Sequence, residues 1–151
     1  MTTNDFVATF KGNTETDKIV FLKEHVVNQY VPFLTKVAEC KRIVQATSEI
    51  SEIGEDGKPK NVVFSQSTPM RYLIFTMTLI RMYTDIEYED ANIADSYDKL
   101  AEAGIINKLS MVIPKSEFEE FNTILNMVVS DYFENNRSMV SVFGALLKEA
   151  K

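Results

Sequence analysis

Apolar residues recur at intervals of three and four along most of this chain, and that spacing is the period of one face of an α-helix. The clearest case follows Ser67-Thr68-Pro69, where a hydroxyl that can cap free backbone N–H groups precedes a proline suited to the first helical turn. The segment from there to about Tyr83 is apolar on most sides and is predicted to be the central helix. Arg71 and Arg81 interrupt it, so we do not expect it to cross a membrane.

Capping residues, glycine and proline divide the rest of the chain into further predicted helices. Gly104 is expected to close one helix in a left-handed conformation, and Pro114 to stop the next. Ser116 and Glu119 match a capping box, in which each side chain accepts a hydrogen bond from the other's free backbone N–H. The polar stretch 135–137 is expected to separate the last two helices. The predicted helices, the first of them capped by Thr14 or Thr16, cover residues 14–30, 32–44, 67–83, 91–103, 105–113, 116–134 and 138–147.

The segment between the second and third helices has a different pattern. Gly54-Glu55-Asp56-Gly57 favours a turn, and Val62-Val63-Phe64 favours a strand. We therefore predict a β-hairpin or ordered arm over residues 48–65. An isolated hairpin is only marginally stable in water, so it should lie on the helices or on a partner.

The predicted fold is mainly α-helical, a compact bundle of six to seven helices with this small β-element. A length of 151 residues suits one domain with a substantial core, and no internal repeat or linker divides it. Residues 1–13 lack periodicity and are predicted to form a loose N-terminal arm, which leaves residues 14–151 as the single helical domain.

The chain has one cysteine and one histidine, which narrows the chemistry it can perform. Cys40 alone excludes an internal disulfide or a CxxC pair, and Cys40 with His25 makes a poor zinc site. The spacing of the five glycines fits neither of the phosphate-binding motifs GxxxxGK[ST] and GxGxxG. A calcium-binding loop counted from Asp85 would place Asp90 at the sixth position, where glycine is needed. We therefore expect no catalytic residue, no metal, no cofactor and no enzymatic activity. An enzyme that uses scattered carboxylates remains an alternative to the two binding functions described below.

Charge is unevenly distributed along the chain, whose net charge is −6. Residues 1–84 carry ten basic and nine acidic side chains, whereas residues 85–151 carry six basic and thirteen acidic ones. An acidic surface repels phosphate, so we expect no direct nucleic-acid partner, although Lys36, Lys41 and Arg42 are candidates for a local basic patch. The predicted acidic surface consists of Asp85, Glu87, Glu89, Asp90, Asp95 and Asp98.

The last predicted helix has more apolar residues than one narrow stripe requires. A terminal helix of this kind either docks back onto the fold or offers its apolar face to another chain. We therefore predict a protein partner or a homo-oligomer, bound through Met139, Val142, Phe143, Leu146 and Leu147.

Three stretches carry a family resemblance: KEHVVNQYVPFLTKVAECKRIV, TPMRYLIFTMTLIRMYTDIEYED and FEEFNTILNMVVSDYFENNRSMVSVF. Together and in this order they resemble small helical proteins encoded in the structural-gene regions of phages and prophages of Gram-positive bacteria. The resemblance implies a tail or head assembly factor that acts by binding phage structural proteins. It assigns no residue a role, because it rests on no signature motif.

Two functions of different kinds follow as expectations. The first is a chaperone-like interaction protein that assists virion assembly in the host cytoplasm or in the virion, with no signal peptide and no membrane partner. The second is a phage inhibitor of a host defence nuclease, whose acidic surface would compete with nucleic acid for a basic groove. Salt should weaken the second kind of binding much more than the first.

Overall fold

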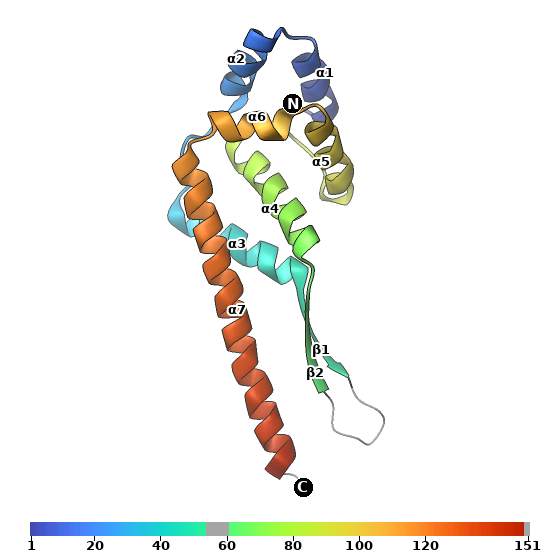
Figure 1. Cartoon of the computed structure of the whole chain (residues 1–151), viewed down its shortest axis with the longest axis vertical. Coiled ribbons are helices and arrows are strands. Elements are labelled where there is room, and N and C mark those ends of the chain that lie inside the picture. Colours follow the sequence, from blue (N-terminus) through green and yellow to red (C-terminus); the bar gives the residue numbers. More distant parts are fainter. Residues whose placement is uncertain (54–60, 150–151) are drawn as a thin grey trace.

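The computed structural model describes residues 1–53 and 61–149, and it describes side chains outside 50–64 and 136–149. The described part contains seven α-helices, one short 3₁₀ helix and two strands (Figure 1). This confirms the prediction of a mainly α-helical bundle with a small β-hairpin. The elements are α1 (Thr3–Lys11), α2 (Glu15–His25), α3 (Phe33–Thr47), β1 (Ser48–Ile53), β2 (Asn61–Gln66), α4 (Thr68–Tyr83), η1 (Asp90–Asn92), α5 (Ile93–Glu102), α6 (Ile105–Val112) and α7 (Lys115–Glu149).

Local signals in the sequence explain several helix boundaries. Thr14 caps α2, and Ser67 caps α4 by accepting a hydrogen bond from the backbone N–H of Met70. Gly104 has a φ of 77° and separates α5 from α6, as predicted. α2 ends at His25, five residues earlier than the predicted end at Tyr30, and this leaves residues 26–32 as a turn before α3.

The predicted hairpin is present as β1 and β2. The strands pair antiparallel, in a register that runs from Ser48 opposite Gln66 to Ile53 opposite Asn61. Arg71 of α4 holds the base of the hairpin by donating hydrogen bonds to the hydroxyls of Thr47 and Ser48, at 3.3 and 3.1 Å. The predicted turn over residues 54–57 lies outside the described residues.

The expected loose arm over residues 1–13 is wrong, because most of it forms α1. Thr2 caps this helix by accepting a hydrogen bond from the backbone N–H of Asp5, at 3.2 Å. Phe6 and Phe10 lie one helical turn apart and are fully buried. The ring centroids of Phe6 and Phe21 are 4.9 Å apart. These buried aromatic side chains help to dock the short helix onto the core.

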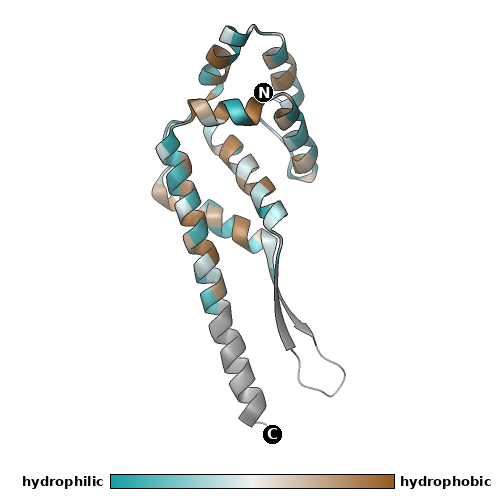
Figure 2. Cartoon of the chain, in the orientation of Figure 1, coloured by the Kyte–Doolittle hydropathy of each residue, from teal (hydrophilic) through white to brown (hydrophobic). Residues whose placement is uncertain are grey.

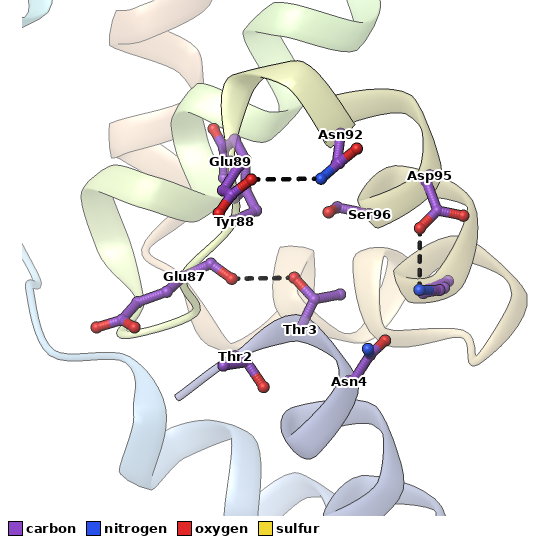
Figure 3. A pocket seen from close by; sticks show the side chains of 10 residues that line it. Thr2, Thr3, Asn4, Glu87, Tyr88, Glu89, Asn92, Asp95 and Ser96 are labelled. Carbon is purple, nitrogen blue, oxygen red and sulfur yellow. Dashed lines mark hydrogen bonds and ion pairs between the residues drawn. The ribbon is translucent and has the colours of Figure 1, made fainter.

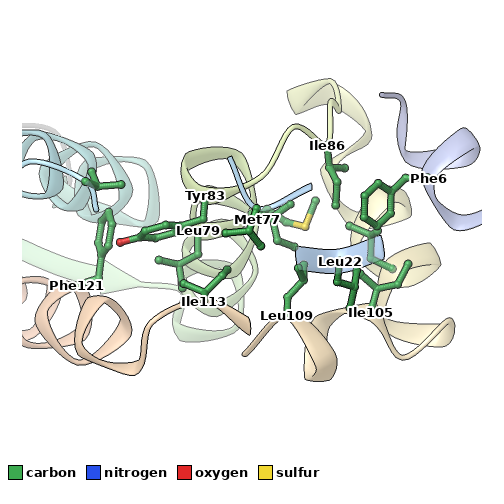
Figure 4. Close-up of a cluster of buried hydrophobic side chains, with 14 of the residues drawn as sticks. Phe6, Leu22, Met77, Leu79, Tyr83, Ile86, Ile105, Leu109, Ile113 and Phe121 are labelled. Carbon is green, nitrogen blue, oxygen red and sulfur yellow. The ribbon is translucent and has the colours of Figure 1, made fainter. Parts of the chain in front are cut away.

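The hydrophobic core runs through the helices around α4. In Figure 4 it extends from Phe121 of α7 at one end to Phe6 of α1 at the other, with Met77 of α4 between them. Figure 2 shows hydrophobic and hydrophilic residues alternating around the helices, as expected where one face of each helix is buried. Within the described residues, no helix has both the length and the apolar character that crossing a membrane requires.

The predicted break at residues 135–137 is also wrong, because α7 is a single helix of 35 residues. Two asparagines and an arginine cost little in a helix that contains no proline there, so the helix continues through them. α7 begins at Lys115, ahead of the predicted cap Ser116, and Glu119 pairs with Lys115 at 3.6 Å. No Ser116–Glu119 capping box is therefore formed in this described segment. The first part of α7 packs against α3.

Candidate protein-interaction site

Four large apolar side chains are exposed at the turn between α2 and α3 and in the first turn of α3. The exposed fractions are 55% for Val27, 64% for Tyr30, 54% for Phe33 and 77% for Leu34. We call these four residues the apolar corner. Single exposed apolar residues are common on protein surfaces, but four of them within eight positions of the chain make this region a candidate interaction site. Met111 and Met127 are also exposed, but they lie on α6 and α7.

The backbone of the apolar corner is tied to the last turn of α4. The N–H groups of Val27 and Asn28 both donate to the carbonyl oxygen of Tyr83, at 2.9 and 3.3 Å. The Asn28 side chain donates to the carbonyl oxygen of Met82 at 2.7 Å. These bonds use carbonyls that a helix end leaves without partners, so they satisfy α4 and fix the turn together.

A cluster of charged and polar side chains lies beneath the corner. Lys36 Nζ lies 2.8 Å from Glu117 Oε2 and 2.9 Å from Glu120 Oε1. Tyr83 donates its hydroxyl to Glu117 Oε1 at 3.0 Å. We call Lys36, Tyr83, Glu117 and Glu120 the buried ion cluster, although the Glu120 side chain is partly exposed.

The buried ion cluster contacts the apolar corner directly. Buried Val31, in the middle of the turn, donates its N–H to Glu117 Oε1 at 2.8 Å. The ammonium of Lys36 lies 4.9 Å from the ring centroid of Tyr30, within range of a cation–π contact. The exposed Tyr30 ring therefore covers a lysine that is 0% exposed.

The neighbours of Glu117 and Lys36 keep both groups charged at neutral pH. Burial acts to raise the pKa of Glu117, but hydrogen bonds from Lys36, Val31 and Tyr83 outweigh it, so the pKa lies below its usual value. Burial acts to lower the pKa of Lys36, but Glu117 and Glu120 outweigh it and the pKa is raised. Burial and the nearby Glu117 carboxylate also raise the pKa of Tyr83, so its hydroxyl stays protonated and donates.

Sequence reasoning missed this cluster. The sequence makes Lys36 a candidate for a local basic patch, but the structure buries it together with Cys40, Ile43 and Val44 on the inner face of α3. Glu117 lies one helical turn before buried Phe121 on α7, just as Lys36 lies one turn before buried Cys40 on α3. The signal that could have revealed both residues is a charge at an apolar position of the helical repeat.

Half of the predicted acidic surface has side-chain partners within the chain. Asp85 pairs with His25 at 2.8 Å, Asp90 with Arg81 at 2.6 Å, and Asp95 with Lys99 at 2.9 Å. Glu87, Glu89 and Asp98 are exposed. The six residues lie along the connection after α4 and the first turns of α5, so the structure does bring them into one region.

Part of this acidic region lines a pocket of about 380 Å³ between the start of α1 and α5 (Figure 3). Its walls include Thr2, Glu87, Glu89 and Asp95. In the described part of the chain, every buried side-chain nitrogen or oxygen has a hydrogen-bond partner. The same residues contain no group of His, Cys, Asp or Glu arranged to hold a metal ion. The pocket is therefore a hollow lined by polar side chains.

His25 and Cys40 have different partners in the structure. His25 packs against Phe21 in a tilted arrangement, with ring centroids 4.4 Å apart, and pairs with Asp85. Cys40 is fully buried with Sγ 3.8 Å from the carbonyl oxygen of Phe121, and burial raises the pKa of its thiol to about 12. At neutral pH this thiol is not a nucleophile.

The predicted partner-binding residues lie on the distal part of α7, where only the backbone is described. Their side chains are outside the described residues, so their role stays a prediction. They are Met139, Val142, Phe143, Leu146 and Leu147.

Comparisons of this chain with protein-family models, with curated proteins and with solved structures found no match.

Proposed function

We propose that this chain is a non-enzymatic protein-binding factor and that the apolar corner is its main binding surface. The observation that carries the proposal is the exposure of Val27 and Tyr30 on a turn whose backbone is held by α4 and by Glu117. Phe33 and Leu34 are exposed next to them, in the first turn of α3. A surface that is already ordered loses little conformational entropy when a partner binds.

The chemistry of the corner suits an apolar segment of another protein chain. Tyrosine and other large aromatic side chains supply much of the binding energy at the centres of interfaces. Tyr30 and Phe33 provide two such rings, and Leu34 is the most exposed member of the corner. The predicted partner residues on distal α7 begin roughly 33 Å along the helix from Glu117, so they would form a second, separate contact with a partner.

The proposed setting is virion assembly, and it rests on the resemblance to phage structural-region proteins. In that setting the partner is a head or tail protein, and the chain acts in the host cytoplasm before or during assembly.

The test replaces Phe33 and Leu34 with Asp, with Met111→Asp as the matched control. Both changes put charge on an exposed apolar site, but Met111 lies on α6 and is not one of the four residues of the corner. The probes are the capsid, portal and tail proteins of the phage genome that carries this gene, each co-expressed and co-purified with the chain. We expect one of them to bind the unaltered chain and the M111D variant, and to lose at least about tenfold in affinity for F33D/L34D, or roughly 1.4 kcal/mol.

Two results would contradict the proposal. In one, a phage protein binds the unaltered chain, M111D and F33D/L34D equally well. In the other, no head or tail protein binds the unaltered chain. Light scattering measures the oligomeric state of the unaltered chain and of F33D/L34D without a partner. A dimer that becomes a monomer in F33D/L34D would show that the corner binds a second copy of this chain instead of a phage protein. Circular dichroism of each variant shows whether the fold is retained.

Inhibition of a host nuclease is the alternative, and it has less support. An inhibitor of this kind needs free carboxylates, whereas Asp90 and Asp95 each pair with a cation of this chain and Asp85 is bound to His25. Binding to a nuclease that falls steeply with salt and is lost on Glu87→Gln/Glu89→Gln would favour it.

A further inference from the structure

We infer that Glu117 is a positioning residue for the apolar corner, holding the corner in its binding conformation from the first turn of α7. The inference rests on the proposed function, because it explains how the proposed binding surface is kept ordered. Glu117 is itself buried, so it would act on binding through the corner and would not contact the partner.

One carboxylate joins four parts of the fold. Glu117 belongs to α7 and accepts hydrogen bonds from Val31 of the turn, Lys36 of α3 and Tyr83 of α4. The three distances are 2.8, 2.8 and 3.0 Å. Val31 and Glu117 are 86 positions apart in the chain, so this contact exists only in the folded molecule.

The contact with Val31 is specific to the turn. Val31 is buried, and its N–H has no helix or strand neighbour to accept its hydrogen bond, because it lies between α2 and α3. A buried N–H without an acceptor is unfavourable, so without Glu117 the turn would move to find another acceptor. Tyr30, Phe33 and Leu34 lie within three residues of this point and would move with it.

Lys36 extends the same control to the ring of Tyr30. The ammonium beneath this ring is held in place by Glu117 and Glu120. Stability alone does not account for such a cluster, because apolar side chains of similar size often replace a buried ion pair without loss. The cluster instead gives the turn a defined geometry through directional hydrogen bonds.

The experiment compares local order with global stability. The variants are Glu117→Gln and the neutral pair Lys36→Met/Glu117→Gln, which removes both charges with little change in size. Glutamine keeps one oxygen that can accept from Val31, but this bond lacks the charge that strengthens a hydrogen bond to a carboxylate. The control is Glu119→Gln, an exposed glutamate two positions away that pairs only with Lys115 among the described residues. Hydrogen exchange measured by mass spectrometry follows the peptide that contains residues 27–34, and peptides from α4 report on the core.

We expect amides of the corner to exchange at least tenfold faster in K36M/E117Q, while α4 amides and the melting temperature stay close to those of the unaltered chain. E119Q should leave both unchanged. A second readout uses Tyr30→Trp, which would be the only tryptophan of the chain. Its fluorescence anisotropy should fall when E117Q is added and should not fall when E119Q is added.

Unchanged exchange in the corner of a folded K36M/E117Q protein would overturn the inference. Unfolding of both Glu117 variants would also overturn it, because the cluster would then serve folding alone. Neither result depends on a partner. The proposed function fails separately, if F33D/L34D binds the phage proteins as well as M111D does.

Discussion

Single charged residues inside the core decide how this molecule responds to pH. Lys36 and Glu117 are 0% and 5% exposed, and each depends on the other to remain charged. Removing one member of a buried pair leaves the other uncompensated, which costs about 3–5 kcal/mol. The cluster is therefore the place where one side-chain change should alter both stability and its pH dependence.

Glu117→Gln should lower the free energy of unfolding at pH 7 by about 3 kcal/mol. The pKa of Glu117 is lowered in the folded state from 4.5, so its ionisation stabilises the fold above that value, and this stabilisation is lost as the pH falls through the folded-state pKa. The variant should therefore lose less stability than the unaltered chain between neutral and acid pH. Urea unfolding at a series of pH values measures this, with E119Q as the control. Parallel pH profiles for E117Q and the unaltered chain would show that Glu117 does not carry the acid response.

The position at which each helix ends depends on local signals in the sequence and on whether the next residues can continue the helix. α7 passes through Asn135 without a break because nothing there forbids helical backbone. Gly104, in contrast, sits at a φ of 77° between α5 and α6, where a side chain is disfavoured. The two cases show that backbone conformation, more than polarity, decides where these helices end.

Gly104→Ala should destabilise the protein by about 1 kcal/mol, because an L-residue with a Cβ is strained in the left-handed region. No atom lies within 4 Å of a Cβ built at this position, so backbone strain is the whole expected cost. Asn tolerates this conformation, and Gly104→Asn should cost less. Gly12→Ala is the matched control, because Gly12 caps α1 with an ordinary φ of −75°. Chemical unfolding of the three variants checks this, and an equal loss at both glycines would contradict it.

At the scale of the whole molecule, the N-terminal segment is part of the structure around α4 and α5. Thr3 donates its N–H and its hydroxyl to the carbonyl oxygen of Glu87, at 3.2 and 3.1 Å. α1 also packs against α2 and α5. The first helix therefore belongs to the same core as the helices that follow, and it closes one side of the polar pocket.

Phe6→Ala should lower the free energy of unfolding of the whole protein by about 3–5 kcal/mol, as expected for a buried phenylalanine. Phe6 is fully buried, whereas Phe33 of the apolar corner is half exposed, so Phe33→Ala should cost much less. Thermal unfolding followed by circular dichroism gives both values. A Phe6→Ala protein with an unchanged transition would mean that α1 frays independently, as a loose arm would.

Much of the fold could be predicted because its signals are local. The caps at Thr14 and Ser67, the glycine at 104 and the hairpin over 48–65 each depend on residues a few positions apart. The candidate site could not be predicted in this way. The sequence shows that Tyr30, Phe33 and Leu34 are apolar, and apolar residues at helical spacing are usually expected in a core.

The sequence by itself determined the helical class, the hairpin and most helix starts, because hydrogen bonding and steric preference within one or two turns are enough to select them. Only the tertiary structure decided which apolar residues stay exposed, that α1 docks, and that a lysine and a glutamate 81 positions apart are buried together. Burial and charge pairing depend on what other segments supply at the same point in space. Neighbouring residues in the chain carry no information about those segments.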